Sequence, residues 1–326
     1  MLAFILRRLA QAVLVMLCVA LIAFMLFQFV GDPVSHMLGQ DATAEQIREA
    51  RDALGLNNSI LTQFWHFLSN AVQGDFGFSL RQGSKVSTLV AERFPATLEL
   101  ALAAAFLALC FGIPMGVYAA LRRGTFGSQL LMTASLLGVS LPTFLIGIVL
   151  ILIFAVNLIW FPSFGRGEVT RIGWWTTSFL TLKGWHHMAL PAITLAIFQL
   201  TLIMRLVRAE MLEVLRTDYI KFARARGLSD RAVHFGHALK NTLVPVMTIA
   251  GLQIGGLIAF AIITETAFQW PGRGPRVIPA VSSAAAIVMV AYCVLPRVIF
   301  VVINLIVDLL YFAVDPRLRV EKPGGH

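Results

Sequence analysis

Charged residues are scarce in this sequence: Asp, Glu, Lys and Arg make up only 13% of its 326 residues, against roughly 25% in a typical soluble domain. Hydrophobic residues make up 58%, and the mean hydropathy is +0.80. A water-soluble core cannot bury so much apolar surface, so the composition excludes a soluble globular protein and predicts a membrane protein. The apolar runs are continuous rather than alternating, which favours membrane-spanning helices over a β-barrel.

Motifs for covalent or metal chemistry are also missing. The chain has no Gly-Lys dipeptide and therefore no phosphate-binding P-loop. The pairs His186/His187 and His234/His237 have no Cys or carboxylate beside them in a ligand arrangement, so we expect no metal site. The cysteines lie far apart inside apolar runs, as small buried hydrophobes do, and they predict no disulfide framework: Cys18, Cys110 and Cys293.

The apolar windows predict an all-helical protein with about six membrane spans, each long enough for a hydrocarbon core of about 30 Å. The first run follows two arginines but is too long for a signal peptide and has no cleavage motif, so we expect an uncleaved span. The predicted spans cover 9–30, 97–121, 130–157, 187–208, 243–266 and 284–312.

The distribution of basic residues predicts the orientation. With a cytoplasmic amino terminus, 15 of the 26 Lys and Arg residues lie in short inner segments close to the spans. The positive-inside rule then places both termini in the cytoplasm and accounts for the net charge of +9, which makes nucleic-acid binding a poor explanation of that charge.

Two connections are expected on the outer side. Segment 31–96 is polar enough to fold outside the membrane, with a capping box at 43–46 and a second helix from Ser59 to Gly74. It is either a packed cap on the membrane domain or a docking surface for a delivery protein. The loop at 158–186 carries tryptophans at both ends, which is typical of an interfacial belt. The predicted apolar stripe of the second helix consists of Leu61, Phe64, Trp65, Leu68 and Val72.

The cytoplasmic segment 209–241 is the most informative part of the sequence. Its apolar and basic residues recur at helical spacing and predict a short amphipathic helix that ends at Gly227. Ser229 can cap a second helix after the turn. Composition alone leaves two interpretations open, a lipid-facing anchor and a protein contact.

Ten sequence motifs in a fixed order resemble one family, the inner-membrane permeases of bacterial ATP-binding-cassette (ABC) importers for dipeptides, oligopeptides, glutathione and nickel. The matching motifs are FILRRL at 4–9, GDP at 31–33, LGL at 54–56, AVQGDFGFS at 71–79, RFPATLELA at 93–101, LPAITLA at 190–196, DYIKFARARGL at 218–228, HALKNTLVPV at 237–246, ETAFQWPGRG at 265–274 and NLIVDLLYFAVDPRLR at 304–319.

The resemblance implies a type I importer permease that carries short peptides across the bacterial inner membrane. It would pair with a homologous second permease, two ATPase subunits and an extracytoplasmic binding protein. ATP and Mg²⁺ would be bound by the ATPases, so this chain would hold no cofactor and would not be an enzyme by itself. The implied organisation is a first span at 1–30, an extracytoplasmic segment at 31–96, a five-helix core at 97–312 and a cytoplasmic tail at 313–326.

The resemblance also assigns a coupling helix, which in this family inserts into a groove on the ATPase. Small residues allow close docking, a glycine allows the turn, and arginines can pair with acidic groups of the partner. Lys221 and Phe222 replace the first two residues of the broad importer consensus, as is usual in the peptide branch. The implied contact begins at Asp218 and Tyr219 and continues through Ala223, Arg224, Ala225, Arg226 and Gly227.

Four residues of the last two predicted spans are candidates for the translocation path. Gln253 and Gly255 belong to a small-xxx-small pattern that serves either close helix packing or the pore seam. Glu265 would meet substrate or form an interfacial ion pair. Arg297, one residue after Pro296, lies where the family has apolar residues and would line the path or pair across the permease interface.

Substrate and mechanism remain open at this level. Glutathione or a nickel chelate would suit the same family. A membrane-embedded enzyme would need a polar catalytic constellation inside the spans, and the sequence shows none. An autonomous channel would not need a cytoplasmic segment built to meet a partner.

Overall fold

The computed structural model describes most of the chain in several continuous stretches. These are residues 2–29, 57–73, 84–173 and 175–270, with positions 43, 45, 48, 51–52, 75 and 78–79. The described residues belong to two compact units whose boundary within the long helix α5 falls between Pro95 and Ala96. The predicted span at 284–312, including Pro296 and Arg297, lies outside the described residues, as does most of the capping box at 43–46.

The first unit contains helices α1 (Leu2–Phe29) and α4 (Ile60–Val72). Ser59 caps α4 by accepting a hydrogen bond from the Thr62 amide at 3.3 Å, which confirms the predicted start of this helix. Phe24 of α1 packs against Phe64 and Phe67, with ring centroids 5.5 and 5.9 Å apart. The unit also holds a short antiparallel pair, β1 (Phe78–Ser79) and β2 (Ser84–Lys85).

The residues of the predicted apolar stripe lie on a helix, α4, but they differ in exposure. Phe64 and Leu68 are half-buried, but Leu61, Trp65 and Val72 are exposed. The aromatic contacts with α1 are made by Phe64 of this stripe and by Phe67, which was not assigned to it, and both pack against Phe24.

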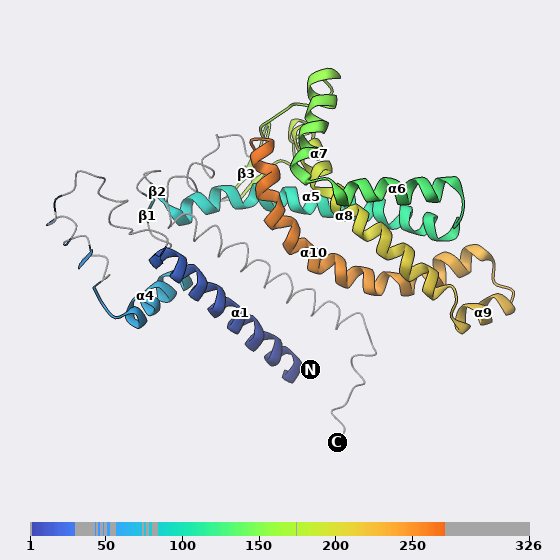
Figure 1. The fold of residues 1–326 in the computed structure, drawn as a ribbon, viewed down its shortest axis with the longest axis horizontal. Helices are drawn as coiled ribbons and strands as arrows, with labels where there is room; N and C mark the ends of the chain where they lie inside the picture. Colours follow the sequence, from blue (N-terminus) through green and yellow to red (C-terminus); the bar gives the residue numbers. More distant parts are fainter. Residues whose placement is uncertain are drawn as a thin grey trace. The chain divides into compact units, whose positions relative to one another are not determined.

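The second unit holds the end of α5 and the helices that follow it. Its elements, with the whole of α5, are α5 (Val86–Leu121), α6 (Phe126–Ser140), α7 (Thr143–Leu150), η1 (Ile151–Asn157), α8 (Leu182–Val214), α9 (Asp218–Ala225), η2 (Ala232–Ala238) and α10 (Leu239–Ala267). Thr125 caps α6 and Thr181 caps α8 through their hydroxyl oxygens. Helices α8 and α10 pack against each other, and α9 lies at one end of this pair (Figure 1).

Two findings depart from an all-helical architecture. The chain is mostly helical, but short two-stranded hairpins occur as β1–β2 and as β3 (Thr170–Ile172) with β4 (Trp175–Thr177). The predicted span at 130–157 is not one helix either, because it breaks at Leu141 and Pro142 and bends by 108°. Leu141 is extended (φ −88°, ψ 134°), the conformation favoured before proline, and Pro142 cannot continue the α6 hydrogen-bond ladder.

Within the described residues, three helices are long and apolar enough to cross a membrane, and the bent pair would make a fourth. They are Ala91–Leu121, Leu182–Val214 and Ala232–Ile258, and Leu9–Ile22 forms a shorter apolar helix. These correspond to the predicted spans at 97–121, 187–208 and 243–266. The count of six stays a prediction.

Helices α5 and α8 approach closely at two glycines. A Cβ added at Gly116 would lie 2.7 Å from the Met204 carbonyl oxygen and 2.7 Å from the Val207 Cβ. At Gly112 it would lie 3.0 Å from the Ile203 Cγ2. Gly112 and Gly116 form a GxxxG pattern, which lets two membrane helices bring their backbones together.

A Gly116→Val substitution is expected to lower the free energy of unfolding by about 1–3 kcal/mol, because the new side chain must push the α8 backbone away. The measurement is the Tm of the purified protein in detergent. Gly236→Val is the matched control, since Gly236 is also helical but its added Cβ would meet no other part of the described chain within 4 Å. Equal Tm values for both variants would contradict the close α5–α8 contact.

Candidate functional site

The segment predicted to be amphipathic forms two helices joined by a tight turn. Helix α9 begins at Asp218 and ends at Ala225, and Asp218 pairs with Lys221 at 2.8 Å on its exposed face. The Asn241 amide donates a hydrogen bond to the Tyr219 hydroxyl at 2.6 Å, which ties the start of α9 to α10. Tyr219 is therefore a structural link as well as an exposed side chain.

The turn after α9 confirms the sequence prediction. Gly227 has φ +78°, in the left-handed region that glycine adopts without strain. Its amide donates to the Arg224 carbonyl at 2.9 Å and closes the turn. Ser229 then accepts from the amide of Ala232 at 3.4 Å and caps the next helix.

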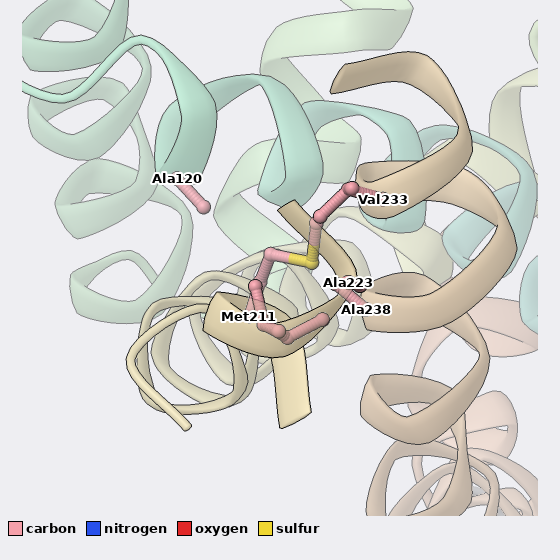
Figure 2. Packing of buried hydrophobic residues seen from close by; sticks show 6 residues of the cluster. Ala120, Met211, Ala223, Val233 and Ala238 are labelled. Carbon is pink, nitrogen blue, oxygen red and sulfur yellow. The ribbon is translucent and has the colours of Figure 1, made fainter. Parts of the chain in front are cut away.

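The two helices share a buried base. Figure 2 shows Met211 of α8 at the centre of a cluster, with Ala120, Ala223, Val233 and Ala238 around it. Ile220 completes the cluster and is fully buried, as are Met211 and Val233. The cluster packs α9 and η2 against the ends of α5 and α8. The helices on both sides of the turn at Gly227 are therefore anchored by buried contacts.

The last five residues assigned to the coupling contact, 223–227, divide into two groups. Ala223 is only 7% exposed and faces the buried cluster, so it supports α9 and is not available to a partner in this structure. Arg224, Ala225, Arg226 and Gly227 are exposed. We call these four residues the coupling turn.

An aromatic ring beside the coupling turn adds to its surface. Phe222 is 63% exposed, and the Arg226 guanidinium carbon lies 5.7 Å from its ring centroid. The surface thus combines two cations, one aromatic face and a backbone stretch covered by no bulky side chain. Such a surface can dock closely and can pair with carboxylates.

The candidate path residues lie along α10. Gln253 is half-buried and lines a cavity of about 360 Å³, while Gly255 is buried. Glu265 is half-buried near the carboxyl end of the same helix. The structure therefore brings Gln253 to a cavity, and it places Gly255 in the packed part of α10.

A buried ion pair was not found by sequence reasoning. Arg166 donates from Nη2 to the Glu99 carboxylate at 2.6 Å, and the two residues are 5% and 2% exposed. Its other nitrogens donate to the hydroxyls of Ser178 at 2.8 Å and Thr176 at 2.9 Å. The Ser178 amide also donates to Glu99 at 3.1 Å, so the loop before α8 is fastened to α5.

The carboxyl end of α10 joins the same cluster. The Arg166 guanidinium lies 5.9 Å from the Trp270 ring, and the Trp270 indole donates to the Ala96 carbonyl at 3.4 Å. The Gly165 amide donates to the Phe268 carbonyl at 3.1 Å. We call Glu99, Arg166, Ser178 and Trp270 the charged clamp.

The side chains of His186 and His187 make local contacts. The His186 Nε2 lies 2.6 Å from the Trp160 carbonyl, and the His187 Nδ1 lies 2.8 Å from the Lys183 carbonyl. Over the part of the chain that the structure describes, no group of three His, Cys, Asp or Glu side chains could hold a metal ion.

Comparison with known families decides the identity. The family model described as "Binding-protein-dependent transport system inner membrane component" matches residues 112–320, and the model for the amino-terminal part of such components matches residues 1–101. The chain belongs to this permease family.

Relatives of the permease match it along their whole length. A di/tripeptide transport system permease protein (DppB) of Pseudomonas aeruginosa is 40% identical over 99% of this chain and 100% of its own. A glutathione transport system permease protein (GsiC) of Escherichia coli is 35% identical over 98% of this chain and 100% of its own. The predicted membership in the peptide and glutathione branch of ABC importer permeases is confirmed.

One residue of the charged clamp can be recognised from the sequence of the permease. Glu99 is a carboxylate inside the apolar run of α5, and a buried charge requires a partner. The sequence gives no means of choosing Arg166, which is 67 residues away, among the basic residues of the loops.

Proposed function

We propose that this permease is one pore subunit of a bacterial importer of short peptides, and that its coupling turn receives the work of ATP hydrolysis from a partner. The single observation that carries the proposal is the turn itself. Four exposed residues with two arginines stand on a base of fully buried side chains. A rigid base is needed because only a stiff element transmits a displacement of its tip to the helices behind it.

The remaining parts of the proposal follow from this role. A homologous second permease completes the pore, two ATPase subunits bind ATP and Mg²⁺, and an extracytoplasmic binding protein delivers the substrate. Both termini and the tail at 313–326 lie in the cytoplasm with segment 209–241, and segment 31–96 lies outside. The chain performs no covalent chemistry itself and lies in the bacterial inner membrane.

The translocation path is proposed to run along α10. Gln253 supports this assignment because it lines a cavity, and Glu265 lies further along the same helix. Gly255 serves helix packing in this account, and Arg297 is proposed to line the path or to pair with the second permease.

Short peptides are the proposed substrate because the di/tripeptide permease shares 40% identity with this chain. The glutathione permease shares 35% identity with this chain and is also matched over its full length, so glutathione is the second candidate and a nickel chelate the third.

The test is uptake by the complete complex in proteoliposomes. With ATP enclosed and the binding protein outside, labelled trialanine is expected to accumulate in the lumen, and glutathione at equal concentration is expected to accumulate more slowly. The non-hydrolysable ATP analogue is the control. Trialanine accumulation that is equal with the analogue, or absent with ATP, would overturn the proposed function.

A further inference from the structure

One cavity of the second unit lies beside the break between α6 and α7. It has a volume of about 360 Å³, within the range of about 300–1,000 Å³ that is typical of small-molecule sites. Helices α8 and α10 form the other walls. Most of the lining is aliphatic or aromatic, with Phe144, Leu195, Phe198, Leu257 and Phe260 among the contributing side chains.

Two side-chain amides interrupt this apolar lining. Gln199 of α8 is 3% exposed, and its Nε2 donor has no hydrogen-bond partner among the residues that the structure describes. Gln253 of α10 lines the same cavity. A buried amide donor without a partner costs free energy, so its presence at a cavity wall indicates a partner that comes and goes.

The backbone at the break supports the same conclusion. Ser140, Leu141, Pro142 and Thr143 all line the cavity. Non-helical backbone at membrane depth is tolerated where it borders a cavity or is buried in protein. Pro142 gives α7 no side-chain cap, and its carbonyl accepts hydrogen bonds from the amides of Leu145 at 3.0 Å and Ile146 at 3.2 Å.

We propose that this cavity is a transient binding site for the main chain of the transported peptide, with the Gln199 Nε2 donating to a peptide carbonyl and the Gln253 amide pairing with a neighbouring peptide group. The assignment rests on the proposed function and deepens it.

The chemistry of the lining fits a peptide bond better than a charged ligand. The polar residues of the cavity lining are the neutral Gln199, Gln253, Ser140 and Thr143, and it contains no Lys, Arg, His, Asp or Glu among the described residues. Neutral hydrogen-bonding groups can bind the main-chain amide, which every peptide has, whatever side chains the peptide carries. They also bind weakly, which a path needs because the substrate must leave again.

The experiment measures trialanine uptake by the reconstituted complex with Gln199→Met and Gln253→Met. Each variant keeps the length of the side chain and removes its amide group. The transported peptide therefore loses one hydrogen-bond partner in the cavity. We expect the maximal uptake rate to fall roughly 3- to 10-fold per variant, while the apparent KM set by the binding protein stays unchanged. Thr194→Val is the matched control, because the Thr194 hydroxyl is buried on α8 but bonds its own helix at Leu190.

A second substrate tests the chemistry. An analogue of trialanine with an ester in place of one amide lacks an N–H donor, so Gln253→Met is expected to slow the analogue less than trialanine. Both substrates are delivered by the same binding protein. Any preference of that protein for one substrate cancels when the uptake rate of the variant is divided by that of the parental complex for each substrate.

Three outcomes would overturn the assignment. If both variants transport trialanine as fast as the parental complex, the cavity is not part of the translocation path, and the proposed function is unaffected. Failure of the variants to assemble with the second permease assigns the amides to a subunit contact. Absence of trialanine uptake by the parental complex overturns the proposed function and the site together.

Discussion

A permease carrying Arg224→Glu and Gly227→Pro is expected to lose ATP-driven peptide uptake by roughly 30-fold or more while it still inserts into the membrane. Gly227 has φ +78°, which proline cannot adopt, so the substitution opens the turn. The glutamate reverses the exposed positive charge of Arg224. Neither residue belongs to the buried cluster that holds α9, so folding is preserved.

Uptake in proteoliposomes and ATPase co-purification are the two measurements for this variant. Lys240→Glu is the matched control, because it makes the same change of charge at an exposed position on α10. The control is expected to transport at the parental rate. Parental uptake by the double variant would remove the coupling role from the turn at Gly227.

The second large effect concerns the charged clamp. Arg166→Met is expected to lower the free energy of unfolding by about 3–5 kcal/mol, because it leaves the carboxylate of Glu99 buried without its cation. Hydrogen bonds to Ser178 and Thr176 are lost with it, which releases the loop before α8. The measurement is the Tm of the purified permease in detergent.

An exposed pair near the same loop serves as the control. Lys183 and Glu168 lie 2.5 Å apart but are 68% and 62% exposed, so Lys183→Met is expected to change the stability by about 0–1 kcal/mol. The double variant Arg166→Met, Glu99→Met is expected to be more stable than Arg166→Met alone, since no buried charge is left unpaired. A double variant less stable than the single one would contradict the ion-pair explanation.

Local signals in the sequence were enough to predict several elements of the fold. Ser59 and Ser229 start helices as expected, and Gly227 makes the turn, because a cap or a left-handed glycine depends on residues only three or four positions away. The spans that correspond to α5, α8 and α10 could also be predicted locally, because each is a continuous apolar run.

Three features were not predicted, one with a local signal and two that depend on distant residues. The span at 130–157 was expected to be continuous, although Pro142 carries a local signal for a break that its apolar neighbours obscured. Ala223 was assigned to the coupling contact, but packing against Met211 and Val233 buries it. Gln199 could not be distinguished from an ordinary polar residue of a span until the cavity showed where its amide lies.

Two tightly bonded parts of the permease lie at the two ends of the α8–α10 pair. The buried cluster around Met211 fixes the coupling turn at one end. The charged clamp joins α5, the loop before α8 and the end of α10 at the other. The cavity with its two amides lies between these helices, where a movement of α10 against α8 would change its shape.

The central claim is that the coupling turn contacts an ATPase subunit, and a cross-link tests it most directly. In a chain whose three cysteines are replaced by serine, Ala225→Cys is combined with a short bifunctional thiol-to-amine reagent in the assembled complex. The account predicts an adduct between this chain and an ATPase subunit, and none when Cys is placed at the buried Ala223. An adduct only with the binding protein, or with neither partner, would contradict it.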